Sequence, residues 1–414
     1  MVTGGVENGD DEDDGEEDEE GKSLKLVVNG NLKLNGSHAF QLKNKASVYV
    51  SGSINMNNAG TTMDVNYAST FYVHQDININ NNGAILYVNN PTHQFVNFFV
   101  KKDLSVYGGT IDTANITYPD GRLNMFVQGK LSTGNPAKFG TGLPDRLITY
   151  LPNKDVNGNT ITQNHEVSAW QASIKAGIYA PASKVSTDSN ILGAITCETM
   201  SSYSGTKTYS PLMAAINLNG NTVFPNNNSN NDGIVTIKKS DTGWNDNPVN
   251  RYWDKNYTPF NLQFAIESVP AVPSAPSGTS YISFSDINNG ENRVFPSEGN
   301  YQSSGNYRLN KIQVNRGTLK ITGPANIYID NGIEVNNGSS ILAEGNVSFF
   351  IKGKLQLNNG SSFLIKDSSN VYVGNEMESN ASTFIYEGTN SEGSSGGGED
   401  DQKIKLGHIS WKEQ

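Results

Sequence analysis

An aromatic and polar cluster between residues 242 and 257 is the segment of this sequence best equipped to bind a ligand. It reads TGWNDNPVNRYWDKNY. Aromatic faces stack on pyranose rings, while planar amides and carboxylates take sugar hydroxyls. The segment therefore predicts a glycan or partner surface made of Trp244, Asn245, Asp246, Arg251, Tyr252, Trp253, Asp254 and Tyr257. The alternative is structural, because a long loop usually needs aromatic anchors that pin it to its support.

Asp76 and Asp103 are the acids with the spacing closest to a catalytic pair, since they occupy the same position in successive sequence repeats. A polysaccharide lyase or hydrolase needs paired carboxylates a few ångströms apart, or acids that hold calcium beside a basic side chain. The alternative is two solvated corner acids beside Lys101 and Lys102. We expect no catalytic residues, with a glycan-active enzyme as the alternative.

Metal and phosphate chemistry lack their usual spacings in this sequence. The five histidines, His38, His74, His93, His165 and His408, show no H-x-x-x-H or H-E-x-x-H pattern. There is also no P-loop, no G-x-S-x-G and no G-x-G-x-x-G after a strand. Cys197 is the only cysteine, which excludes a disulfide framework and a cysteine-based zinc site, so a small apolar residue on a strand is expected. We therefore expect no metal site and no cofactor. The alternative is Ca²⁺ on the acidic N-terminal run, which lacks EF-hand spacing.

A short phrase repeated along the chain must position any such residues. Between residues 309 and 387 it occurs four times, with lead residues Ile312, Ile333, Leu355 and Met377 at spacings of 21, 22 and 22. From residue 24 onward it occurs five more times, with leads Leu32, Ile54, Ile77, Leu104 and Leu131. A repeat of this length cannot bury its own apolar face, so each copy must rest on the next.

Alternation within each copy predicts the strand conformation. Ile77-Asn78-Ile79-Asn80 points one side chain inward and the next outward, as in a half-buried strand. Paired asparagines precede the turns, and their amides are expected to form a hydrogen-bonded ladder along the stack; these pairs are Asn57-Asn58, Asn81-Asn82, Asn336-Asn337 and Asn358-Asn359. The sequence thus predicts an all-β protein, a right-handed parallel β-helix with two repeat blocks and an inserted irregular region.

The chain divides at changes of composition. We predict a disordered acidic tail at 1–22, a β-solenoid at 23–265 with a loop insertion at 202–260, a Pro/Ser linker at 266–280 and a second solenoid block at 281–390. A flexible tether at 391–402 and a terminal strand at 403–414 follow. Within the first block, residues 177–180 and 193–196 predict two tighter rungs, and residues 164–175 suggest a helix.

The net charge of −11 is concentrated in the acidic tail. Glu7 and residues 10–20 supply eleven acidic charges, so the rest of the chain is close to neutral. No basic footprint for nucleic acid is present, and no run of 18 apolar residues predicts a membrane span. The partners that remain are surface glycans, filament components or a second copy of the chain bound through solenoid edges.

Two segments resemble a known family. GPANIYIDNGIEVNNGSS at 323–340 and GIYAPASKVSTDSNILGAI at 177–195 resemble the β-helical C-terminal module of PilX-like pilus-assembly and related bacterial surface proteins. The resemblance extends to Tyr301, to residues 327–332, and to the structural motif residues Gly177, Tyr179, Ala180, Pro181, Asn190, Gly193 and Gly332. It implies an extracellular or cell-surface location and association with a pilus or a similar filament.

Taken with the repeats, this resemblance predicts a non-enzymatic, envelope-displayed structural or adhesin-like solenoid. Two alternatives remain open. One is a glycan-binding or glycan-cleaving β-helix, and the other is a self-assembling filament subunit joined through the strand at 403–414.

Overall fold

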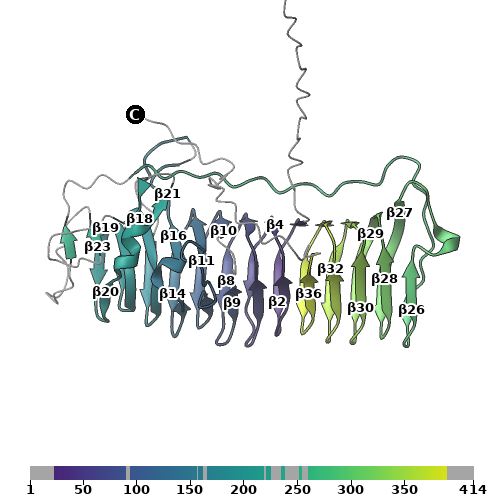
Figure 1. Ribbon diagram of the computed structural model, residues 1–414, viewed down its shortest axis with the longest axis horizontal. Coiled ribbons are helices and arrows are strands. Elements are labelled where there is room, and N and C mark those ends of the chain that lie inside the picture. The colour runs from purple at the N-terminus through teal and green to yellow at the C-terminus, as the bar shows by residue number, and fades with distance from the viewer. Residues whose placement is uncertain are drawn as a thin grey trace, which may run out of the picture.

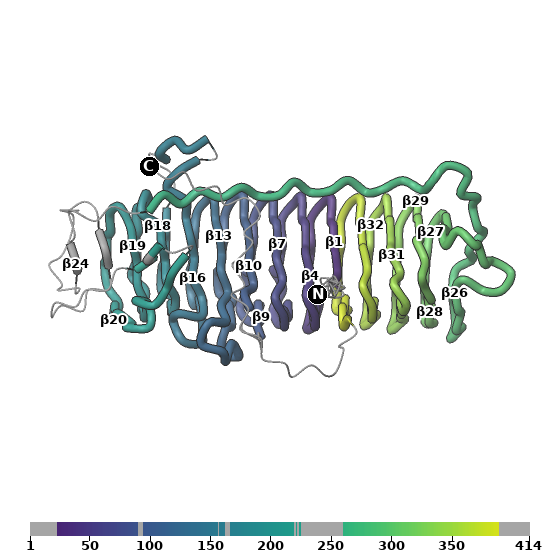
Figure 2. Tube along the Cα trace, turned by 45° about the horizontal axis from the view of Figure 1, so that its top comes forward, coloured from purple at the N-terminus to yellow at the C-terminus, as the bar shows by residue number. Residues whose placement is uncertain are grey.

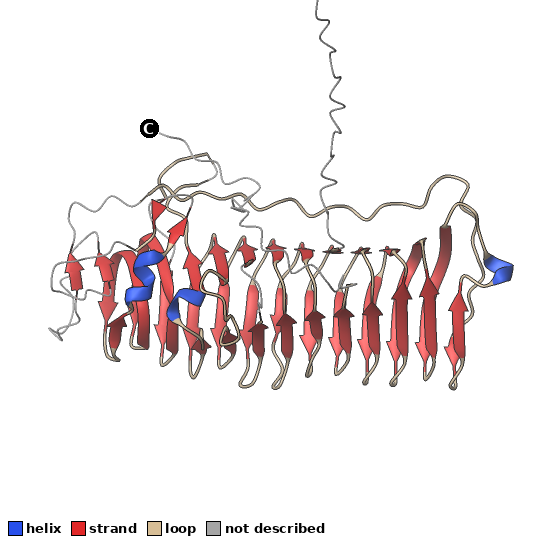
Figure 3. Ribbon diagram, in the orientation of Figure 1, coloured by secondary structure: helices blue, strands red, loops and turns tan. Residues whose placement is uncertain are grey.

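Short strands joined by tight Gly/Asn turns wind into a long solenoid (Figures 1 and 3). The computed structural model describes residues 23–89, 94–155, 157–161, 166–218, 221–224, 235–237, 251–253 and 260–388. Within these ranges the predicted all-β class is confirmed, and the helical turns are three 3-10 segments: η1 (Pro144–Arg146), η2 (Pro211–Ala215) and η3 (Glu298–Asn300). The predicted tail at 1–22 and the segments at 391–402 and 403–414 lie outside the described residues.

Three parallel sheets, here called faces A, B and C, form the sides of the solenoid, and each is given in its spatial order. Long strands that bend at a corner belong to more than one face. Face A contains β27 (Asn306–Asn315), β29 (Ala325–Asn336), β31 (Val347–Ile351), β34 (Ser369–Val373), β1 (Leu24–Val28), β4 (Ala46–Val50), β7 (Ser69–Val73), β10 (Phe95–Val100), β13 (Arg122–Val127), β16 (Leu147–Tyr150), β18 (Ser173–Thr187), β19 (Asn190–Ser202), β23 (Val235–Ile237) and β24 (Arg251–Trp253). Face B contains β25 (Ile287–Asn288), β27, β29, β32 (Lys354–Asn358), β35 (Met377–Asn380), β2 (Leu32–Asn35), β5 (Ile54–Met56), β8 (Ile77–Asn80), β11 (Leu104–Tyr107), β14 (Leu131–Gly134), β17 (Glu166–Trp170), β18 and β19. Face C contains β26 (Asn292–Phe295), β28 (Thr318–Thr322), β30 (Ser340–Glu344), β33 (Ser362–Ile365), β36 (Thr383–Tyr386), β3 (Phe40–Leu42), β6 (Thr62–Val65), β9 (Ile85–Val88), β12 (Thr110–Asp112), β15 (Lys138–Phe139), β18, β19 and β20 (Lys207–Tyr209).

The repeated lead residues align as the sequence predicts. Ile312 pairs with Ile333, which pairs with Leu355, and the same register continues through every later copy. These side chains point inward and are almost fully buried in one apolar core. The tighter rungs are also confirmed, because Gly177 pairs with Ala194 on the next turn.

The two repeat blocks form one continuous stack. The N-terminal block (β1–β24) begins in the middle of the rod and winds to one end, and the C-terminal block (β25–β36) winds from the opposite end back to the middle (Figure 1). There β34, β35 and β36 pair in parallel with β1, β2 and β3. We call this pairing the junction. The last described rung of the chain therefore rests on the first.

Residues 260–282, here called the strap, carry the chain from one end of the rod to the other. They run in an extended path along the outside of the stack, past the N-terminal block and on to the far end of the C-terminal block (Figure 2). The predicted Pro/Ser linker at 266–280 lies within the strap. It is extended, as expected, but the blocks that it connects are stacked on each other through the junction.

Residues 166–175 form strands and not the helix that the sequence suggested. Val167 and Ala169 point inward from β17, which pairs with β14 on one side and β18 on the other. The helical spacing had counted Trp170 as an inward residue, yet its side chain is 38% exposed. The backbone hydrogen bonds that two neighbouring rungs offer to this segment outweigh the weak preference of such a short sequence for a helix.

Asparagine ladders run along the corners. The predicted amide ladder forms at Asn336-Asn337 and Asn358-Asn359, whereas Asn81 donates to the Asn57 backbone carbonyl oxygen (2.8 Å). On face B each amide donates to the next rung in the order Asn35, Asn380, Asn358, Asn336, Asn315 and Asn288, with N–O distances of 2.8–3.2 Å. Asn359 likewise donates to Asn337. The face B ladder passes through the junction without a break, so the amides tie the two blocks together as they tie rungs within a block.

Among the described residues, none belongs to a helix with the length and apolarity needed to cross a bilayer.

Candidate functional site

The predicted aromatic cluster at 242–257 falls largely beyond the residues that the structure describes. Trp244, Asn245, Asp246, Asp254 and Tyr257 lie outside them. Arg251, Tyr252 and Trp253 form the short strand β24, which pairs with β23 and extends face A at one end of the rod. The glycan or partner surface assigned to these residues stays a prediction.

The two candidate catalytic acids hold the backbone of a corner. Asp76 Oδ1 accepts a hydrogen bond from the Asp103 backbone N–H (3.1 Å), and Asp103 Oδ1 accepts one from the Lys130 N–H (2.8 Å). At the two preceding rungs, Asn31 Oδ1 accepts from the Ser53 backbone N–H and Ser53 Oγ accepts from the Asp76 backbone N–H. The acids therefore stack as the sequence indicated, and one oxygen of each carboxylate is engaged by the next rung.

The histidines that the structure describes make separate contacts. His38 Nδ1 lies 3.4 Å from Asp64 Oδ2, and His74 Nε2 donates to the Glu267 carbonyl oxygen at 2.8 Å. His93, His165 and His408 lie outside the described residues. In the described ranges no three His, Cys, Asp or Glu side chains gather as metal ligands. Cys197 is buried on β19, and this burial raises the pKa of its thiol.

The glycines of the family motif occupy places with no room for a side chain. A Cβ on Gly177 would overlap the side chains of Met213 and Phe224. Gly193 has φ +152°, and a Cβ there would overlap the Ala176 carbonyl oxygen. A Cβ on Gly332 would lie 2.7 Å from the Lys354 carbonyl oxygen. Close backbone approach accounts for Gly193 and Gly332, and tight side-chain packing accounts for Gly177.

The other motif residues shape and anchor strands β18 and β19. Ala180 and Pro181 lie at the register shift between face A and face B in β18. Asn190 Oδ1 accepts from the Thr206 backbone N–H (2.8 Å). Tyr179 stacks on Phe260 with ring centroids 4.5 Å apart. Tyr301, by contrast, is 72% exposed beside a hollow near η3, at the far end of the C-terminal block.

An outward-facing row of aromatic rings, here called the outer aromatic stripe, is the largest feature that the sequence analysis missed. It contributes one ring per rung on face A: Tyr328, Phe350, Tyr372, Tyr49, Tyr72, Phe99, Phe126, Tyr150 and Tyr179. Six neighbouring pairs stack with centroids 4.7–5.4 Å apart. A signal was present, because in seven of these copies the ring directly precedes a Val or Ile that lies four residues before the lead.

The stripe is interrupted once, at the junction. Val27 of β1 stands between Tyr372 and Tyr49, which are its partners in the neighbouring rungs. The Lys25 ammonium lies 5.8 Å from the Tyr372 ring and 5.6 Å from the Tyr49 ring. A cation over two ring faces is attracted by both, so this lysine bridges the gap between the two blocks.

The strap covers the stripe and is held to it by specific contacts. Phe264 is 2% exposed and meets Phe126 edge-on, with centroids 5.4 Å apart. Farther along, the Glu267 carboxylate accepts hydrogen bonds from the Tyr49 hydroxyl (3.0 Å) and the Tyr72 hydroxyl (3.1 Å). Burial, followed by these contacts with Glu267, raises the pKa of both phenols, so they stay protonated and act as donors.

Backbone groups of the strap also find partners on the rod. The Leu262 N–H donates to Asn153 Oδ1 (2.7 Å), Gln128 Nε2 donates to the Phe264 carbonyl oxygen (2.9 Å), and Asn29 Nδ2 donates to that of Pro270 (3.3 Å). An extended segment has no hydrogen bonds of its own, so these side chains satisfy part of its backbone. Residues 271–281 are mostly exposed.

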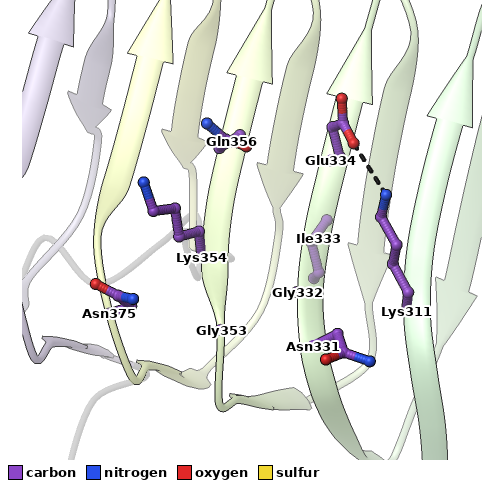
Figure 4. Close-up of a pocket in the computed structure, with 9 residues that line it drawn as sticks. All are labelled: Lys311, Asn331, Gly332, Ile333, Glu334, Gly353, Lys354, Gln356 and Asn375. Atoms are coloured by element: carbon purple, nitrogen blue, oxygen red, sulfur yellow. Dashed lines mark hydrogen bonds and ion pairs between the residues drawn. The ribbon is translucent and has the colours of Figure 1, made fainter.

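A hollow lined by polar side chains lies on face B (Figure 4). Its volume is about 360 Å³. Lys311, Gly332 and Lys354 occupy equivalent positions on three successive rungs, so the two lysines stand about 10 Å apart. Because Gly332 has no side chain, the space between them is open.

Acidic partners neutralise the lysines that flank this hollow. Lys311 Nζ lies 3.0 Å from Glu334 Oε2, and Lys354 Nζ lies 3.2 Å from Glu376 Oε1. Hydrogen bonds from Asn336 and Lys311 lower the pKa of Glu334. The hollow thus offers ammonium, carboxylate and amide groups on one surface, which suits a polar ligand with several hydroxyls.

Comparisons with protein-family models, with curated proteins and with solved structures find no match for this chain. The PilX-like resemblance therefore stays a prediction.

Proposed function

We propose that this chain is a structural, adhesin-like rod displayed outside the cell or on its envelope, in association with a pilus or another surface filament. The observation that carries the proposal is the unbroken stack of rungs through the junction. A stack in which every internal rung is paired on both sides makes a long rigid body, and corner side chains such as the face B asparagines hold neighbouring rungs together.

Both ends of the described chain lie at the centre of this rod, which would suit side-on attachment. The Ser23 carbonyl oxygen accepts from the Ser369 N–H (3.3 Å). Gly388 lies beside Asn44, in the loop between β3 and β4. The first and the last described residues therefore lie near the junction and away from both ends of the rod.

Surface labelling of intact cells tests this function. Cells that produce the protein are treated with an impermeant protease or an antibody against the rod, with a known cytosolic protein as the control. We expect cleavage or labelling of the rod while the control stays intact. Protein found wholly inside unbroken cells would contradict the proposal.

Glycan binding is a second candidate, and the hollow on face B is the observation that favours it. Its ammonium, carboxylate and amide groups match the hydroxyl and acidic groups of a polysaccharide. Incubation with a panel of acidic polysaccharides separates the outcomes. Retention without product indicates a binding module, new reducing or unsaturated ends indicate a hydrolase or lyase, and no retention by any glycan rejects both.

A further inference from the structure

We propose that the junction is an exchangeable docking surface whose second partner is another copy of this chain. In the closed rod the C-terminal block rests on the N-terminal block of the same molecule. In the exchanged form it rests on the N-terminal block of a neighbour. This inference goes beyond the proposed function, because it concerns how rods become joined and holds whatever surface they serve.

The junction contacts resemble those between any two rungs, and none of them is covalent. Residues 24–28 pair with residues 369–373 without a register shift. The Asn35 amide donates to Asn380 at 2.8 Å, close to the 2.9 Å between Asn358 and Asn336 within the C-terminal block. On face C the Phe40 and Phe384 rings stack with centroids 5.4 Å apart. A second copy could supply each of these contacts.

An ion pair and a hydrogen-bond ladder also make the junction specific. Lys33 Nζ lies 2.5 Å from Glu376 Oε2, and Glu376 binds Lys354 of its own block through its other oxygen. The two surfaces of the junction are therefore complementary to each other in charge and in hydrogen bonding. A contact of this head-to-tail kind closes a ring when two copies exchange reciprocally, or extends into a chain when they do not.

The length of the strap sets the balance between closure and exchange. From Phe260 beside Tyr179 to Pro270 beside Asn29, ten residues cross six rung steps, or about 29 Å. This half is already close to the roughly 31 Å that ten residues of polyproline II span. Its anchors, if released, would free little additional length.

The slack lies in the second half of the strap. From Pro270 to Ile282, which donates its N–H to the Arg308 carbonyl oxygen, twelve residues cross only four rung steps, or about 19 Å. Deletion of residues 271–278 leaves four residue steps, which reach about 14 Å at most. The shortened strap cannot reach the far end of its own C-terminal block while that block occupies its own junction.

The test is this eight-residue deletion, compared with a variant in which the same residues become eight Gly and Ser residues. The deletion variant is expected to form dimers or longer species in light scattering, because its C-terminal block can dock only on a neighbour. The substituted variant keeps the strap length and is expected to stay monomeric at the same concentration. The full chain is used in both cases.

Crosslinking identifies the surface that joins the copies. Gln41 faces outward on β3, opposite Ile385 of the C-terminal block across the junction and opposite Asp64 within its own block. A short bis-maleimide should couple Gln41→Cys to Ile385→Cys between copies in the deletion variant and within one chain in the substituted variant. The matched pair Gln41→Cys and Asp64→Cys should couple within one chain in both. Cys197 can remain because it is buried.

A monomeric deletion variant with an intramolecular Gln41–Ile385 crosslink would overturn the proposal. So would larger species in which only the Gln41–Asp64 pair reacts. If the deletion prevents folding, two copies of the full-length double-cysteine chain with different size tags are refolded together at rising concentration. Mixed crosslinked pairs that increase with concentration support exchange, and their absence at every concentration rejects it.

Discussion

Replacing Phe264 by alanine is expected to release the strap from the outer aromatic stripe. The Phe264 ring is 2% exposed and packs edge-on against Phe126 and at a tilt against Phe99. Truncation of a buried phenylalanine to alanine removes about 3–5 kcal/mol of stability. Because the strap is a surface segment, we expect this loss to appear first as local opening, while the rungs beneath keep their pairing.

Hydrogen exchange at the Leu262 amide measures this opening directly, because that N–H is bonded to the Asn153 side chain only while the strap is docked. A loss of about 3–5 kcal/mol corresponds to exchange that is about 10²- to 4 × 10³-fold faster. Tyr301→Ala is the matched control, since that aromatic side chain is 72% exposed and its loss should change exchange very little. Unchanged protection of Leu262 in Phe264→Ala would refute the assignment of this ring as an anchor.

Three further substitutions test the rungs, each by urea denaturation. Gly193→Ala should lower stability by several kcal/mol because its Cβ overlaps backbone, whereas Gly338→Ala, with φ +73° and open space, should lose only about 1–2 kcal/mol; equal losses would contradict this. Asn358→Ala breaks two ladder bonds and should lose about 1–3 kcal/mol, against no loss if the ladder is incidental. Burial alone would raise the pKa of Glu376, but its two lysine partners lower that pKa below its ordinary 4.5. The contribution of Glu376 to folding stability is therefore complete above about pH 4.5, and it is lost as the pH falls through the lower folded-state pKa. Glu376→Gln should therefore lose less stability than the wild type on acidification, and parallel pH profiles would reject the pairing.

The repeat register could be predicted from the sequence because it depends on local alternation. Each lead residue must point into the core, and a slip by one residue would turn the whole strand outward. The spacing of Ile312, Ile333 and Leu355 therefore specified the stacking partners that the structure contains. The asparagine ladder follows from the same register, since equal positions in equal repeats must lie one above another.

The order of the rungs in space could not be predicted in the same way. Any repeat can pair with any other, so the apolar positions of β1 fit β34 as well as they fit β4. The strap brings the last rung to the first by carrying the chain to the opposite end of the rod, and its sequence shows stiffness but not direction. The candidate site raises a similar difficulty: the hollow on face B depends on Gly332 standing between two lysines from different copies, and this becomes evident only after the rungs are stacked.

The outer aromatic stripe gives the strap a physical reason to exist. A solenoid with one exposed ring per rung would carry a long apolar surface, and such surfaces promote association. The first half of the strap covers this surface with few residues, because its ten residues cross six rung steps. Its polar anchors are placed where the rings end in hydroxyls, at Tyr49 and Tyr72. The stripe thus fixes the path of the strap, and the strap determines which blocks can close on each other.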